Sequence, residues 1–104
     1  SPYQVNLLLG GYDASTSTAS LYFLDYLASM HKVKFAAHGY AGYLVLGLMD
    51  KLYRDDMPLE EGLSVLRAAI AQVQRRFLVN APNYIIKIVD ADGYRVLETG
   101  AAPQ

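Results

Sequence analysis

The sequence predicts an α+β fold in which two helices follow one pair of strands and precede another. Three observations support this prediction. Apolar residues alternate or run together near both ends of the chain, they recur every three to four residues in its middle, and the two helical patterns are consecutive. A parallel β/α protein would instead alternate strands with helices. With 104 residues, the chain has room for one domain at most.

The first two strands are predicted at residues 3–9 and 21–27. In the first, the apolar residues at odd positions share one face, and Gly10 and Gly11 are expected to end the strand. The second has apolar residues on both faces, which is typical of a strand covered on both sides. The polar residues 13–20 between them exceed what a tight hairpin needs, so we expect antiparallel pairing across a projecting loop.

Two helices are predicted next. From Gly39 onward, apolar residues up to Tyr53 recur at helical spacing nearly all round, which indicates packing on more than one side. The second helix is expected to begin near Pro58, with acidic residues at its start and Arg75 and Arg76 at its end, as the helix dipole favours. Residues 80–83 are expected to end it.

The last two strands are predicted at residues 84–89 and 94–97. Between them, Asp92 and Gly93 form a dipeptide that strongly favours a tight hairpin. The tail from Thr99 onward is expected to be frayed.

Composition excludes several classes of function. Nine basic and ten acidic residues give a net charge of −1, so no nucleic-acid partner is expected. Without cysteine and with only two histidines, no metal site is predicted, and no motif indicates a cofactor. Charged residues interrupt every apolar run before the ~20 residues of a membrane span. No secretory signal pattern stands at Ser1.

The hydropathy of the chain is unusual for its size. The mean hydropathy is +0.13, and 53% of the residues are hydrophobic. A domain this small leaves much of its surface exposed when it folds alone. We therefore expect the surplus apolar surface to be buried against partners or against the rest of a longer protein.

Asp25 and the two histidines are the candidate chemical groups. Asp25 lies among apolar residues, where a carboxyl could be a buried acid, but no second acid is spaced for catalysis. Bonding to loop amides or to a basic partner is the favoured interpretation. His38 could lie beside an anion hole at a helix start, but no serine follows in this turn, so packing or hydrogen bonding is favoured. His31 is expected in a solvated loop.

Gly39, Gly42 and Gly47 are closely spaced but lack the Lys-Ser or Lys-Thr of a phosphate-binding loop. Small residues that let helices or chains approach closely are the better explanation. The nine tyrosines are mostly explained as core aromatics, although an amphipathic contact surface is an open alternative.

Several stretches of the chain resemble proteasome beta subunits, in particular the non-catalytic ones. The order and spacing agree over essentially all 104 residues. The matching stretches are residues 21–27, Phe35-Ala36-Ala37-His38-Gly39-Tyr40, Asp50-Lys51-Leu52-Tyr53 and Asp92-Gly93, with Gly11-Tyr12-Asp13 before them.

The resemblance implies that residues 1–104 form the C-terminal half of a single domain, a four-layer αββα sandwich of the N-terminal-nucleophile hydrolase type. Strands that are apolar on both faces fit half of such a sandwich. The other half would supply the opening strands, two helices and, in active members, the threonine nucleophile with its lysine and aspartate partners. Thr16, Thr18 and Thr99 do not match the position of that nucleophile.

In active members, a serine opens the first helix of this half and an Asp-x-x-Ser follows the second. The resemblance places Tyr40, Phe77 and Asn80 at these three positions. A threonine nucleophile needs polar groups that orient its base and water, and these side chains would not provide that network. The resemblance therefore implies a non-catalytic, structural subunit with no catalytic residue, metal or cofactor in this half.

The resemblance also implies partners and a location. The partners would be beta subunits of the same and the opposite ring and subunits of the alpha ring, in a hetero-oligomeric 20S particle of the cytoplasm and nucleus. Two alternatives remain open from the sequence. One is a catalytic threonine-peptidase subunit whose nucleophile lies in the other half, and the other is a free-standing binding module that folds alone.

Overall fold

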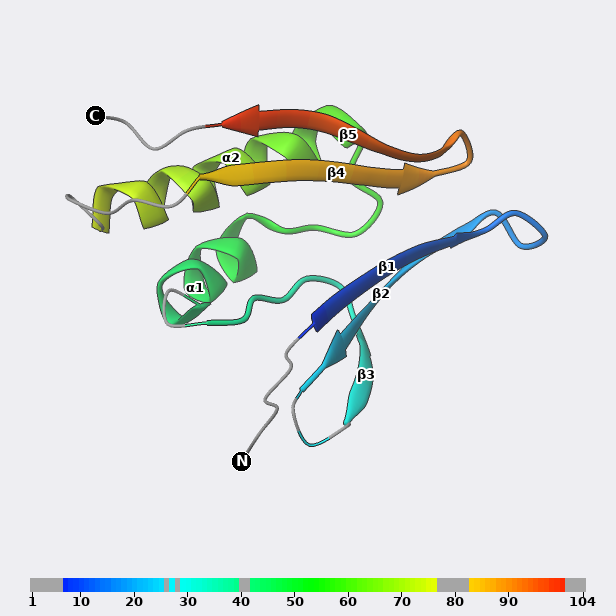
Figure 1. Ribbon diagram of the computed structural model, residues 1–104, viewed down its shortest axis with the longest axis horizontal. Helices are drawn as coiled ribbons and strands as arrows, with labels where there is room; N and C mark the ends of the chain where they lie inside the picture. The colour runs from blue at the N-terminus through cyan, green and yellow to red at the C-terminus, as the bar shows by residue number, and fades with distance from the viewer. Residues whose placement is uncertain (1–6, 26, 28, 40–41, 77–82, 101–104) are drawn as a thin grey trace.

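The computed structural model describes residues 7–25, 27, 29–39, 42–76 and 83–100. The predicted α+β order is present in this part of the chain, with one additional strand (Figure 1). In chain order, the elements are β1 (Leu7–Asp13), β2 (Thr18–Leu24), β3 (Met30–Val33), α1 (Gly42–Leu52), α2 (Leu59–Arg76), β4 (Tyr84–Asp90) and β5 (Gly93–Gly100).

Strands β1 and β2 form an antiparallel hairpin whose pairing runs from Leu7 opposite Leu24 to Asp13 opposite Thr18. The strand continues through Gly10 and Gly11, so the prediction that these glycines end it is wrong. Pairing with β2 satisfies the backbone there, which outweighs the weak strand preference of glycine. Residues 3–6 of the predicted strand lie outside the described residues.

The predicted antiparallel pairing of these strands is confirmed, but their connection is a turn at residues 14–17, so the predicted loop of residues 13–20 is too long. The Asp13 carboxylate accepts hydrogen bonds from the Ser15 amide at 2.9 Å and from the Ser15 hydroxyl at 2.6 Å. Ser17 has φ of 53°, in the left-handed region that such turns use. The hydrogen bonds of the Asp13 side chain therefore stabilise this short turn, and residues 18–20 belong to β2.

Strand β3 is absent from the sequence prediction. It pairs with β2 from Leu24 opposite Met30 to Leu21 opposite Val33, which gives a three-stranded sheet in the order β1-β2-β3. His31 thus lies on a strand rather than in the expected loop. The strand is four residues long and carries polar side chains at its centre, as edge strands often do.

The two helices pack against each other. Val45 and Met49 of α1 and Ala69 of α2 form the buried centre of this contact, with Phe35 and Val73 packed at its margin. A turn that contains Asp56, at φ of 59°, leads to α2, which begins at Leu59, close to the predicted start near Pro58. The predicted end of this helix at residues 80–83 lies outside the described residues except for Asn83.

Strands β4 and β5 form a second antiparallel sheet, and α2 runs alongside it in Figure 1. Asp90 pairs with Gly93, whose φ of 97° suits glycine, so the predicted hairpin is confirmed. Strand β5 extends to Gly100, and Thr99 pairs with Ile85. The expectation of fraying is therefore wrong at Thr99 and Gly100, and residues 101–104 lie outside the described part.

The two sheets meet where β1 approaches β4, at the right of Figure 1. A Cβ atom added at Gly10 would lie 3.4 Å from Cγ1 of Val89, which places β1 and β4 in side-chain contact at this point. In the described part of the chain, neither helix is long and apolar enough to cross a membrane.

Candidate functional site

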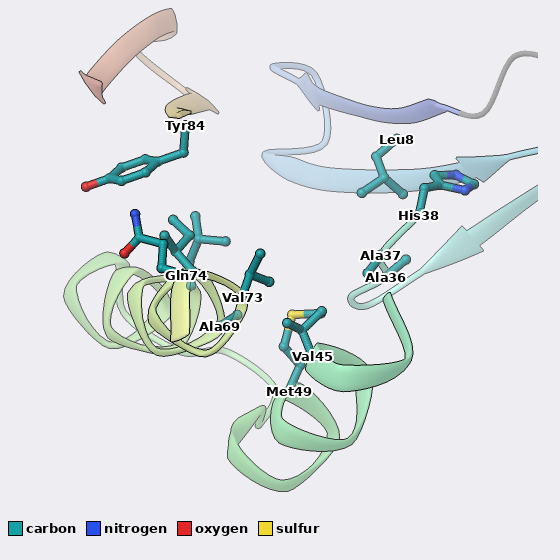
Figure 2. A pocket seen from close by; sticks show the side chains of 12 residues that line it. Leu8, Ala36, Ala37, His38, Val45, Met49, Ala69, Val73, Gln74 and Tyr84 are labelled. Atoms are coloured by element: carbon teal, nitrogen blue, oxygen red, sulfur yellow. The ribbon is translucent and has the colours of Figure 1, made fainter. Parts of the chain in front are cut away.

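A cleft of about 320 Å³ lies where the two helices, β4 and the β1 side of the molecule converge (Figure 2). Val45 and Met49 of α1 face Ala69 and Val73 of α2 across it. The remaining lining residues come from the other elements and from further along α2. They are Leu8, Ala36, Ala37, His38, Leu66, Ile70, Gln74 and Tyr84.

The cleft contains little that could perform chemistry. Among the described residues that line it, the polar side chains are His38, Gln74 and Tyr84, and none is a serine, threonine or carboxylate. Nucleophilic or acid–base catalysis requires such groups within hydrogen-bond reach of one another. The cleft is therefore suited to contact with apolar groups.

His38 has the packing and hydrogen-bonding role that the sequence favours. Its ring stacks on Phe23 of β2 with the centroids 4.1 Å apart, and its Nε2 lies 2.9 Å from the carbonyl oxygen of Leu7. Because a carbonyl only accepts, Nε2 carries the hydrogen and donates. His38 thus ties the segment before α1 to the first strand.

Asp25 also has the role that the sequence favours. Its carboxylate accepts hydrogen bonds from the amides of Leu27 at 2.9 Å and Ser29 at 3.1 Å. Its own amide donates to the Ser29 carbonyl, so Asp25 shapes the turn between β2 and β3. Beside it, the Ser29 hydroxyl lies 2.7 Å from Nε2 of His31. These groups hold a turn together.

The three closely spaced glycines differ in their surroundings and backbone conformation. Gly42 is buried, and a Cβ there would lie 3.6 Å from the Ala37 carbonyl oxygen, an ordinary contact in a tight place. Gly39 has φ of 93°, which side chains other than glycine rarely adopt. Nothing lies within 4 Å of a Cβ at Gly47. Since the neighbours of Gly42 lie at ordinary contact distance, the close-approach explanation is not supported within this chain at any of the three glycines.

Tyr40, Phe77 and Asn80, the three positions that the resemblance assigns to catalytic support, lie outside the described residues. The structure therefore leaves their interpretation as a prediction. Among the residues that are described, no three histidine, aspartate or glutamate side chains gather as a metal site would require.

Two polar clusters tie the helices to the sheets. On one side, Lys34 pairs with Asp55 at 3.0 Å, and the Tyr53 hydroxyl donates to the same carboxylate. Hydrogen bonds from Lys34 and Tyr53 lower the pKa of Asp55, and the bond to Asp55 raises the pKa of Lys34. Both charged groups are exposed, so the pair orients the loops more than it stabilises them.

On the other side, Arg67 of α2 pairs with Glu98 of β5, and the Tyr84 hydroxyl donates to Glu98 at 3.2 Å. The hydrogen bond from Arg67 is the main cause that lowers the pKa of Glu98. Glu98 pairs with Ile86 in the ladder and therefore lies on the face of β4 and β5 that meets α2.

The opposite face of that sheet is exposed and largely apolar. Ile85 is 59% exposed, and Lys87 and Val96 lie on the same face because they pair across the ladder. On the other sheet, Leu7 and Leu9 are both more than half exposed and point away from the cleft-lining Leu8. In the described part of the chain, thirteen large apolar side chains are exposed and only six hydrophobic residues are buried. More apolar side chains are therefore available for contact with other protein surfaces than are packed in the core.

The exposed apolar side chains of the described residues lie on both sheets and on both helices, so they are not confined to one face. The sequence pointed to this surplus of apolar side chains through its hydropathy but could not assign it to particular faces.

Comparison with known proteins identifies the family. Residues 1–89 match the family model described as proteasome subunit. The chain is 49% identical over 94 residues to proteasome subunit beta type-2 of Oryza sativa and 48% identical over 94 residues to proteasome subunit beta type-2-A of Arabidopsis thaliana. It is 41% identical over 97 residues to proteasome subunit beta type-4 of Saccharomyces cerevisiae.

These matches cover 90 to 93% of this chain and 44 to 49% of the relatives, so the chain spans about half the length of the relatives it matches. The resemblance to proteasome beta subunits that the sequence motifs indicated is thereby confirmed. The chain belongs to the proteasome subunit family.

Proposed function

We propose that this chain is part of a non-catalytic, structural beta subunit of the 20S proteasome core particle, where it helps to build the chamber in which proteins are degraded. The observation that carries the proposal is the set of thirteen large apolar side chains that are exposed among the described residues of a chain of this family. Apolar side chains exposed on sheet faces are typical of proteins that function in an assembly.

Within the subunit, the outer faces of the two sheets pack against a second β layer from the rest of the protein. The exposed Leu7, Leu9 and Ile85 are suited to that contact, since apolar sheet faces pack at about 10 Å from one another. Helices α1 and α2 then form one outer layer of a four-layer αββα sandwich. The partners of the complete subunit are beta subunits of both rings and alpha-ring subunits, in the cytoplasm and nucleus.

The non-catalytic role is supported by the residues that stand at the supporting positions. Tyr40, Phe77 and Asn80 replace the polar groups that active family members carry there, according to the motif spacing. The apolar lining of the cleft adds no group that could take their place. The role of the subunit is therefore one of geometry and assembly.

Covalent labelling of the assembled particle tests this proposal. A threonine-directed electrophile is added to purified particles that contain the full-length subunit, and labelled subunits are identified by mass spectrometry. We expect label on other beta subunits, which serve as the internal control, and none on this one. Label on an N-terminal threonine of this subunit would establish the catalytic alternative, and absence of the subunit from the particle would overturn the structural role as well.

A further inference from the structure

A second surface feature lies between the first turn of α1 and the end of α2. Leu44 of α1 and Gln72, Arg75 and Arg76 of α2 line an open hollow of about 320 Å³, which we call the arginine hollow. Tyr43, next to Leu44 in the first turn of α1, is 91% exposed. Tyrosine and arginine are the residue types that most often supply the binding energy of protein interfaces.

The arginines of the hollow differ from the other three in the chain. Arg54, Arg67 and Arg95 each pair with a carboxylate of the same chain. Within the described residues, Arg75 and Arg76 have no such carboxylate, although they are adjacent and exposed. Two neighbouring guanidinium groups repel each other, and an external anion would relieve this repulsion.

The helix dipole explains only part of this arrangement. Cations in the last turn of α2 interact favourably with its carbonyl groups, but this effect is small at an exposed site. It does not require a hollow beside the charges. The combination of Leu44 and the two arginines in one hollow is better suited to a partner with both an apolar and an anionic part.

We propose that the arginine hollow receives an aspartate or glutamate side chain, flanked by apolar residues, from a neighbouring protein subunit. A guanidinium group binds a carboxylate through two parallel hydrogen bonds, and Leu44 in the same hollow offers apolar contact beside it. Net charge argues against a nucleic acid, since the chain as a whole carries −1. This inference rests on the proposed function, because the partner is a subunit of the same particle.

Site-specific photo-crosslinking tests the location of the contact. The photoreactive residue p-benzoyl-phenylalanine replaces Gln72, which lines the hollow, in the full-length subunit, and the assembled particle is irradiated and digested. We expect a crosslink to a peptide of another subunit that contains an acidic residue. A crosslink to a second copy of this subunit supports the proposal if an acidic residue lies at that site. No crosslink from a fully incorporated subunit would overturn it.

Charge substitutions test the chemistry. Arg75→Gln with Arg76→Gln removes the charges and retains side chains that suit a helix, whereas the two Glu substitutions reverse them. We expect the reversal to lower incorporation into the particle about tenfold, as for a paired interface charge, and the neutral variant less. The matched control for Arg75→Glu is Lys51→Glu, at the other end of α1, since both substitutions make the same change of charge.

The outcomes distinguish this inference from the proposed function. If Arg75→Glu and Lys51→Glu subunits are incorporated equally well, the arginine hollow has no carboxylate partner, while the structural role stands. If the unaltered subunit is not found in the particle, the proposed function fails first. Restored incorporation of the Arg75→Glu subunit by an arginine at the crosslinked acidic residue would establish the pair directly.

Discussion

The three-stranded sheet and the helical part of the chain differ in how much of themselves they bury. The six buried hydrophobic residues are Val45, Met49, Leu63, Ala69, Ile86 and Ile88, which belong to α1, α2 and β4. In strands β1 to β3, no described residue is buried. The helical part thus has the beginnings of its own core, whereas the three-stranded sheet is held by backbone pairing and needs a covering layer.

The largest expected effect is the failure of residues 1–104 to fold alone. In the isolated chain, the two sheets lack the covering layers that the proposed sandwich supplies. Exposed apolar sheet faces of this kind cause protein molecules to associate with one another. We expect the isolated chain to aggregate or to remain molten, with helical signal but no cooperative unfolding transition. Size-exclusion chromatography and a thermal melt check this, with the full-length subunit in its particle as control. A sharp cooperative melt of the monomer would contradict it.

A pair of adjacent residues on β4 tests the comparison within one strand. Ile86 is 2% exposed and meets α2, whereas Ile85 is 59% exposed on the opposite face. In the full-length subunit, Ile86→Ala should cost about 2–5 kcal/mol, because it leaves a cavity in the core. Ile85→Ala should also cost more than about 1 kcal/mol if a second β layer covers it. Hydrogen exchange of β4 and β5 amides in the particle measures both.

The two substitutions have separable outcomes. A cost of less than about 0.5 kcal/mol for Ile85→Ala would mean that this face remains in solvent, and the proposed sandwich would be wrong there. The Ile86→Ala result serves as its control, because the same side chain is shortened on the same strand.

The sequence predicted the elements with strong local signals. The Asp92-Gly93 hairpin depends on a residue that accepts positive φ, and α2 has acidic residues at its start and basic residues at its end. Both signals act within a few residues. The roles of Asp25 and His38 were also predictable, because the sequence supplied no second catalytic group beside either of them.

The errors arose where pairing partners decide the structure. Gly10 and Gly11 were predicted to end the first strand, but their backbone groups pair with β2 and the strand continues. Strand β3 was missed because a four-residue edge strand with polar residues at its centre has no hydrophobic pattern that the sequence could show. Which apolar residues remain exposed depends on packing between distant elements. Tyr43 is the clearest example, because the helical pattern alone gives no reason for it to lie outside the core.

Gly100 tests how far the second sheet is fixed by side-chain packing. A Cβ atom there would overlap the ring of Tyr84, whose hydroxyl donates to Glu98. Gly100→Ala should displace that ring, break the hydrogen bond and cost about 1–3 kcal/mol, as overpacking commonly does. Gly11→Ala is the control, because nothing lies within 4 Å of its Cβ. Equal exchange protection of β4 in both variants would contradict the packing argument.

The smallest effect concerns the turn between β4 and β5. Arg95 donates two hydrogen bonds to the Asp90 carboxylate, at 2.9 and 3.0 Å, and this contact is the main cause that lowers the pKa of Asp90, with the Asp92 amide second. Because the folded-state pKa lies below the unfolded one, the contribution to stability is present above about pH 4 and is lost as the pH falls through the lowered value. Both groups are partly exposed, so the effect should be smaller than that of Gly100→Ala.

Substitution of Arg95 isolates this contribution. Arg95→Gln should raise the pKa of Asp90 toward its ordinary value, since the strongest donor to the carboxylate loses its charge. The methyl signals of Val89, the neighbouring residue, report the titration by NMR in the assembled particle. Arg54→Gln, which removes the partner of Glu61 on the other side of the molecule, should leave that midpoint unchanged. If Arg95→Gln also leaves it unchanged, the hairpin is held by its backbone ladder and by Gly93 alone, and the charge pair is incidental to the fold.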